Sequence, residues 1–139
     1  MFKITSASIC IDCKEPLKLR EFYAKLTGWD KDPNADEYSL ISDTGMNLYF
    51  MGCDFDYIPP VWPEEPGKQQ KQMHFDFCVD DLTAAEEYAI SLGATKTTEP
   101  HSGFHVVLLD PEGHPFCLID PKLHPYAQAA QDAQVKQDA

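Results

Sequence analysis

The sequence predicts an α+β fold made of two copies of one βαβββ unit, a strand, a helix and three further strands. Two segments, 8–13 and 74–79, alternate along the chain as a strand with one buried face does. Each is followed by apolar residues at helical spacing, and each helical pattern ends at a glycine, Gly28 or Gly93. Equivalent positions of the two copies are 66 residues apart in the first strand and the helix, and 68 residues apart in the last strand. Because neither copy is long enough to bury a core alone, we expect a cupped mixed sheet with the helices outside.

The first copy is expected to occupy residues 1–52. Pro16 begins its helix, because proline suits the first helical position, and Gly28 ends it. The buried stripe of this helix consists of Leu19, Phe22, Tyr23 and Leu26. Its strands are expected at 8–13, 38–42 and 47–51.

The second copy is expected to occupy residues 73–120 and to repeat the same order of elements. The buried stripe of its helix consists of Ala85, Tyr88, Ala89 and Leu92. Its strands are expected at 74–79, 104–109 and 115–119.

Residues 53–72 are expected to form an extended linker, because their four prolines exclude a regular helix or a central strand. The aromatic residues of the linker have two interpretations: they pin it to the core, or they line the mouth of a pocket. These residues are Phe55, Tyr57 and Trp62. The tail, 121–139, is rich in alanine and glutamine, and it is expected to be either helical or disordered.

The composition excludes several classes of partner. The net charge is −12 and Arg20 is the single arginine, so nucleic acid and anionic membrane are poor partners. Arg20 follows Leu19 on the helix and is expected to face solvent. Because the predicted strands offer no basic fork for a phosphate, the ligand is expected to be a neutral or cationic small molecule. The sequence shows no membrane span or signal segment and has five cysteines, which favours a cytoplasmic protein with free thiols.

The two faces of the predicted strands differ in polarity. In the second copy the polar face carries His74, Asp76 and Cys78, and the apolar face carries Phe75, Phe77 and Val79. The repeat assigns Ser8, Cys10 and Asp12 to the polar face of the first copy and pairs Tyr49 with Cys117. The apolar faces must lie under the helices, so the polar faces are expected to line the cup. Cys10 and Cys13 point to opposite faces and therefore cannot hold one ion.

His74 is the candidate catalytic residue. It has two interpretations of similar weight: a structural histidine hydrogen-bonded to Asp76, or a general base whose tautomer is set by Asp76 or Asp12. Trp62 is expected near the mouth of the same cavity. Cys117 and Cys78 are expected to be packing residues rather than nucleophiles. For the other histidines, the facing of His101 and His105 is unresolved, and His114 and His124 are expected to be solvated.

Several motifs resemble the glyoxalase/bleomycin-resistance/dioxygenase superfamily, also called the vicinal oxygen chelate fold. The resemblance covers roughly residues 4–120. The motifs that carry it are Leu26-Thr27-Gly28-Trp29, Met73-His74-Phe75-Asp76-Phe77, Leu92-Gly93-Ala94 and the turn Asp110-Pro111-Glu112-Gly113-His114. The chain looks most like glyoxalase-like proteins of uncharacterised substrate.

The resemblance also implies four metal-ligand positions, which fall on Ser8, Tyr49, His74 and Cys117. The chain departs from the pattern here, because serine and neutral tyrosine are poor ligands. We therefore expect no metal cofactor. If a metal is bound, His74 and Cys117 hold it with help from Asp76 or Asp12.

Two classes of function remain. The first is a glyoxalase-like lyase or isomerase that moves a proton on a small carbonyl compound, with His74 and Asp76 catalytic. The ligand-binding residues are then Ser8, Asp12, Tyr49, Trp62 and Cys117. The second is a non-catalytic protein that sequesters a ligand, as bleomycin-resistance members do, and a metal-dependent lyase or dioxygenase is a further alternative. We expect a homodimer, and whether the two units pair within one chain or between chains stays open.

Overall fold

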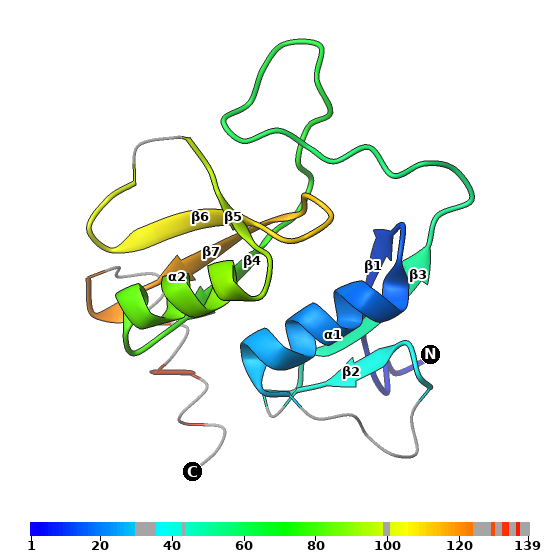
Figure 1. Cartoon of the computed structure of the whole chain (residues 1–139). Coiled ribbons are helices and arrows are strands. Elements are labelled where there is room, and N and C mark those ends of the chain that lie inside the picture. The colour runs from blue at the N-terminus through cyan, green and yellow to red at the C-terminus, as the bar shows by residue number, and fades with distance from the viewer. Residues whose placement is uncertain are drawn as a thin grey trace. The chain divides into compact units, whose positions relative to one another are not determined.

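The chain forms two compact units in the computed structural model, Met1–Tyr57 and Ile58–Ala139 (Figure 1). The structure describes residues 1–29, 36–42, 44–98 and 101–123, together with residues 129, 132, 133 and 136. The boundary between the units falls within the proline-rich segment 53–72. Most of the tail, 121–139, lies outside the described residues.

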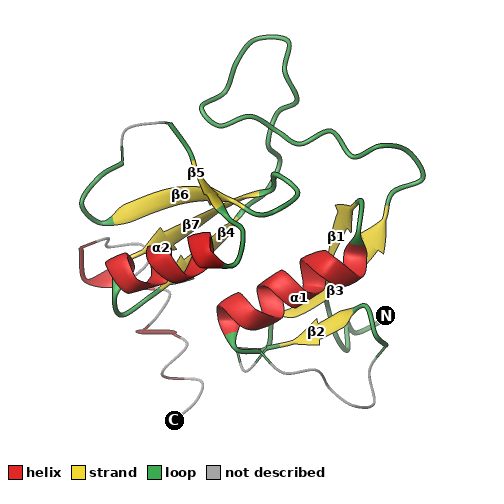
Figure 2. Cartoon of the chain, viewed as in Figure 1, coloured by secondary structure: helices red, strands yellow, loops and turns green. Residues whose placement is uncertain are grey.

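The first unit is a three-stranded mixed sheet with one helix on it (Figure 2). Its elements are β1 (Ile9–Cys13), α1 (Pro16–Thr27), β2 (Ser39–Ile41) and β3 (Asn47–Gly52). The central strand β3 runs parallel to β1 and antiparallel to β2. The predicted strands and helix of this unit are therefore present, with strand ends that differ from the prediction by at most one residue.

Helix α1 begins and ends where the sequence predicts. Pro16 occupies the first turn, and Gly28 follows the helix with a left-handed φ of 71°, which glycine adopts without steric cost. The N–H of Gly28 donates to the carbonyl oxygen of Ala24 at 3.0 Å. The helix buries its apolar stripe against the sheet, where the rings of Tyr23 and Phe50 stack with centroids 5.8 Å apart. Packing of this face, rather than helix propensity alone, holds α1 in place.

The prediction that Arg20 faces solvent is wrong. Arg20 is only 4% exposed, and its Nε donates to the carbonyl oxygen of Ser39 in β2 at 2.6 Å. The long side chain reaches from the helix to a backbone acceptor of the sheet, which a count of helical positions does not reveal. The single arginine is therefore a structural residue of the first unit.

The second unit is a four-stranded mixed sheet in the order β4-β7-β6-β5, with one helix on it. Its elements are β4 (Phe75–Cys78), α2 (Leu82–Ser91), β5 (Thr95–Lys96), β6 (His105–Leu109), β7 (Pro115–Ile119) and the 3₁₀ turn η1 (Pro121–Leu123). The carboxylate of Asp81 caps α2 by accepting from the N–H of Ala84 at 3.0 Å. Ala89 is fully buried, whereas Tyr88 is partly exposed, so the buried stripe of this helix is narrower than predicted. Among the described residues, no helix is long and apolar enough to cross a membrane.

The strand pairing supports the sequence repeat. Cys10 pairs with Tyr49 between the parallel strands β1 and β3, and Asp76 pairs with Cys117 between the parallel strands β4 and β7. These two pairs are equivalent in the repeat, because Asp76 corresponds to Cys10 and Cys117 corresponds to Tyr49. The predicted α+β class is confirmed, with a mixed sheet and one helix in each unit. Within the described residues the second unit has a fourth strand, β5, which the sequence pattern did not locate.

Candidate functional site

The candidate site lies on the polar face of the second sheet. Asp76 pairs with Cys117, and Cys117 pairs with Val107, so these side chains share one face across three strands. The opposite face is aromatic, as predicted, and is lined by Phe75, Phe77 and Phe116. The alternation of β4 therefore separates a polar face from an apolar face.

His74 and Asp76 form a close pair at the start of β4. The Nε2 atom of His74 lies 3.3 Å from Oδ1 of Asp76. The two side chains are 30% and 43% exposed, so a small molecule in solvent can reach both groups. A contact at this distance is compatible with both interpretations of His74, the structural one and the catalytic one.

Trp62 covers one side of this pair. Its indole meets the imidazole of His74 edge to face, with ring centroids 5.0 Å apart. It also packs against a buried apolar cluster formed by Val107, Cys117 and Ile119. Trp62 therefore pins the linker to the core of the second unit and at the same time forms a wall of the candidate site. Phe55, in contrast, is almost fully exposed.

Cys117 brings a third potential metal ligand to the pair. One ligand atom from each of His74, Asp76 and Cys117 lies within 4.8 Å of the others. An imidazole, a carboxylate and a thiolate suit zinc, whose ligands lie about 3–4 Å apart when they share one ion. The donor set thus fits a metal ion better than His74 and Cys117 alone would.

The remaining predicted site residues belong to the first unit. Ser8 and Asp12 are exposed, and Tyr49 is half-buried beside Tyr38, with ring centroids 6.2 Å apart. Burial raises the pKa of Tyr49, and the nearby Asp36, Tyr38 and Cys10 add to the shift. Tyr49 therefore remains a neutral phenol at neutral pH and is a poor metal ligand. A cavity shared by these residues and His74 stays a prediction.

A comparison with known protein families identifies the chain. Residues 8–119 match the family model of the glyoxalase-like domain. The chain belongs to this family. The superfamily predicted from the turn and strand motifs is therefore confirmed, although the family name alone does not specify a ligand or a reaction.

Solved structures support the glyoxalase-like fold. A glyoxalase/bleomycin resistance protein/dioxygenase family enzyme from Burkholderia phytofirmans is 17% identical, with a TM-score of 0.60 over 81% of this chain and 95% of that chain. A glyoxalase-related enzyme from Fulvimarina pelagi is 15% identical, with a TM-score of 0.56 over 84% and 87%. An antibiotic binding protein from a Streptomyces species is 13% identical, with a TM-score of 0.53 over 86% and 98%. No curated protein matches the chain.

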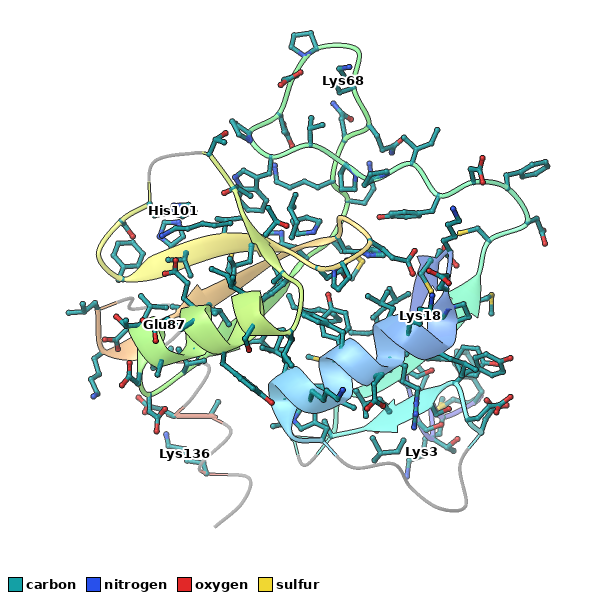
Figure 3. The ribbon with its side chains drawn as sticks, viewed as in Figure 1. Lys3, Lys18, Lys68, Glu87, His101 and Lys136 are labelled. Atoms are coloured by element: carbon teal, nitrogen blue, oxygen red, sulfur yellow. The ribbon has the colours of Figure 1, made fainter. Side chains whose placement is uncertain are left out.

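The other histidines of this glyoxalase-like domain that the structure describes, His101, His105 and His114, have hydrogen-bond partners. His101 pairs with Thr97 at 3.2 Å, and Nδ1 of His105 pairs with the hydroxyl of Ser102. His105 lies two residues before Val107 on β6, and Val107 pairs with Cys117, so His105 and Cys117 share one face of the sheet. Figure 3 shows His101 beside β6. The prediction for His114 is wrong: its Nδ1 lies 2.9 Å from Oδ2 of the buried Asp110, because the tight turn folds the imidazole back onto that carboxylate. His124 lies outside the described residues.

The cysteines of the domain differ in exposure. Cys10 is exposed and Cys13 is fully buried, which confirms that they point to opposite faces of β1. Cys117 is buried in the apolar cluster, as expected for a packing residue. Cys78 is exposed, so the prediction that it is a packing residue is wrong. Partial desolvation still raises the pKa of its thiol, and the neighbouring Asp76 carboxylate raises it further, so Cys78 is protonated at neutral pH and is a weak nucleophile.

Sequence reasoning missed Lys71 and Glu64 beside the site. The Nζ atom of Lys71 lies 4.4 Å from the centre of the Trp62 ring and 2.6 Å from Oε1 of Glu64. Both residues lie in the linker, where no strand or helix period indicates which side chains meet. The signal available was only the presence of a lysine and acidic residues in the same proline-rich segment as a tryptophan.

Proposed function

We propose that the chain binds a small neutral or cationic molecule on the polar face of the second sheet, and that His74 transfers a proton to or from it. The observation that carries this proposal is the contact between His74 Nε2 and Asp76 Oδ1, formed by two partly exposed side chains. A histidine held by a carboxylate is a common arrangement for general acid–base chemistry. The reaction class is that of a lyase or isomerase.

Asp76 would determine which nitrogen of His74 reacts. Because Nε2 lies 3.3 Å from the carboxylate, Asp76 would favour the tautomer that carries its proton on Nε2, which leaves the lone pair of Nδ1 available as the base. The carboxylate also stabilises the imidazolium that forms when Nδ1 accepts a proton. Trp62 supplies an apolar wall next to the imidazole, which would pack against the carbon skeleton of the ligand.

The charge of the chain supports the ligand class. The net charge is −12, and the single arginine is buried in the first unit against Ser39. Asp76 adds negative charge at the site itself. An anionic ligand would therefore be repelled, whereas a neutral carbonyl compound or an organic cation would not.

Proton transfer can be tested before the physiological ligand is known. Small neutral hydroxyketones and aminoketones are incubated with the protein in D₂O, and loss of the C–H signal next to the carbonyl is followed by NMR. We expect exchange above the buffer rate for at least one neutral or cationic compound. If members of the panel bind but none exchanges, the chain is a non-catalytic binder, the function named by the antibiotic binding relative.

A metal-dependent lyase or dioxygenase is a second candidate function. It is favoured by the potential ligand atoms of His74, Asp76 and Cys117, which lie within 4.8 Å of one another. An ion bound there would supply Lewis-acid polarisation of a carbonyl oxygen. His74 would then be a metal ligand and could not act as the general base. The metal-dependent and the metal-free reactions therefore exclude each other.

Metal content distinguishes the two candidates. Protein purified without chelator is expected to carry less than one equivalent of transition metal per chain, as measured by inductively coupled plasma mass spectrometry. The reason is that Cys117 is buried beneath Trp62, and Ser8 and Tyr49 are poor ligands at the other family positions. One full equivalent of zinc, nickel or iron that disappears in His74→Ala would establish the metal-dependent candidate instead.

A further inference from the structure

The segment from Val61 to Lys71 forms a strap that carries Trp62 to the site. The N–H of Val61 donates to the carbonyl oxygen of Gln69 at 3.2 Å, which brings the two arms of the strap together. The N–H of Lys68 donates to the carbonyl oxygen of Glu65 at 3.2 Å and closes the turn at its outer end. The strap is therefore an ordered loop with its own internal hydrogen bonds rather than an open connection.

Trp62 is the one side chain of this strap that packs onto the apolar cluster Val107, Cys117 and Ile119, within the described part of the chain. Cys117 is only 5% exposed, although it lies on the face of the sheet opposite Phe116 and Leu118. The indole packs against the cluster that contains this thiol, and it meets the imidazole of His74 in a T-shaped arrangement. A molecule that needs Cys117 or this side of His74 must displace Trp62.

Lys71 also contacts the indole of Trp62. Its ammonium group lies 4.4 Å from the ring centre, within the range of a cation–π interaction. The same group forms an ion pair with Glu64 at 2.6 Å. Lys71 is 22% exposed in its side chain, so this pair is less screened by solvent than an ordinary surface pair. Lys71 therefore links Glu64 to Trp62, and the two contacts together stabilise the position of the indole at the site.

We propose that Lys71 and Glu64 are positioning residues, which hold Trp62 against Cys117 and beside His74 and so control access to Cys117 and to the side of His74 next to the indole. The role of the site rests on the proposed function, but the opening of the strap does not. The strap opens when the ion pair is weakened, so access increases with ionic strength and decreases when Lys71 stacks on the indole. Neither Lys71 nor Glu64 touches the reacting groups.

The rate of alkylation of Cys117 by iodoacetamide measures this opening without any ligand. The rate is followed by mass spectrometry, with the buried Cys13 of the first unit as an internal reference. We expect Lys71→Ala to speed alkylation about tenfold and Glu64→Gln about threefold, because the first removes both the ion pair and the cation–π contact. Trp62→Ala defines the rate of the uncovered thiol.

Matched variants and salt complete the experiment. Lys68→Ala is the control for Lys71→Ala, since Figure 3 places Lys68 on the outer part of this loop, away from the strands. Raising the salt to 0.5 M is expected to speed alkylation in the wild-type chain and to leave Lys71→Ala unchanged. The proposal is overturned if Lys71→Ala and Glu64→Gln alkylate Cys117 no faster than Lys68→Ala. It is equally overturned if Trp62→Ala leaves the rate unchanged, or if Cys13 accelerates in parallel with Cys117.

These outcomes are independent of the proton-transfer assay. A strap that opens in Lys71→Ala while no compound exchanges hydrogen would leave the strap proposal standing and would remove the proposed reaction. If the wild-type chain catalyses exchange but Cys117 is alkylated no faster in Lys71→Ala, the proposed reaction would stand and the strap proposal would fall.

Discussion

Replacing Asp110 with alanine is expected to lower the free energy of unfolding by about 3 kcal/mol, as measured by urea denaturation. The Asp110 side chain is fully buried at the turn between β6 and β7. Its Oδ1 accepts from the backbone N–H of Glu112 at 2.9 Å, the backbone N–H of His114 at 3.1 Å and Nδ1 of His114 at 3.0 Å. Removal of the carboxylate leaves these donors without their acceptor in a place that water reaches poorly.

Asp120 provides the matched control. Its Oδ1 accepts from the N–H of Lys122 at 3.0 Å in an exposed turn, so the donor can bond to water when the carboxylate is lost. Asp120→Ala is therefore expected to cost less than about 1 kcal/mol. Equal losses in the two variants would show that Asp110 is no more than an ordinary turn residue.

The architecture was predictable because the repeat constrains each element twice. Pro16 and Gly28 mark the ends of α1 through backbone chemistry that acts locally, so sequence alone locates them. The alternation in β4 likewise separates Asp76 from Phe77 without knowledge of any distant residue. The two-residue strand β5 was missed, because two residues are too few to show a period.

Contacts that depend on distant parts of the chain were not predictable. Arg20 reaches a carbonyl oxygen 19 residues away in β2, and nothing in the helical pattern indicates that acceptor. Lys71 meets Trp62 and Glu64 because the strap folds back on itself. The short-range pair of His74 and Asp76, in contrast, was predicted, since two residues on one strand face are neighbours in every sheet.

Replacing His74 with alanine is expected to reduce proton exchange, for a compound that the wild-type chain exchanges, by about 10²- to 10⁴-fold. The reason is that the imidazole is the proposed base and that its partner Asp76 lies too far along the strand face to replace it in the same position. Asp76→Asn is expected to have a smaller effect, about tenfold. The amide oxygen can still accept from Nε2–H, but it no longer stabilises the imidazolium by charge.

The stability of His74→Ala separates the catalytic interpretation of His74 from the structural one. Asp76 is 43% exposed, so water can solvate its carboxylate after the imidazole is removed, and the free energy of unfolding should change by less than about 1 kcal/mol. His101→Ala serves as the histidine control, because His101 bonds to Thr97 outside the pair, and it should leave exchange unchanged. A structural histidine would behave in the opposite way: His74→Ala would cost about 1–3 kcal/mol of stability while the folded fraction kept its exchange rate. That result would show that the contact between His74 and Asp76 stabilises the fold and that His74 is not the base.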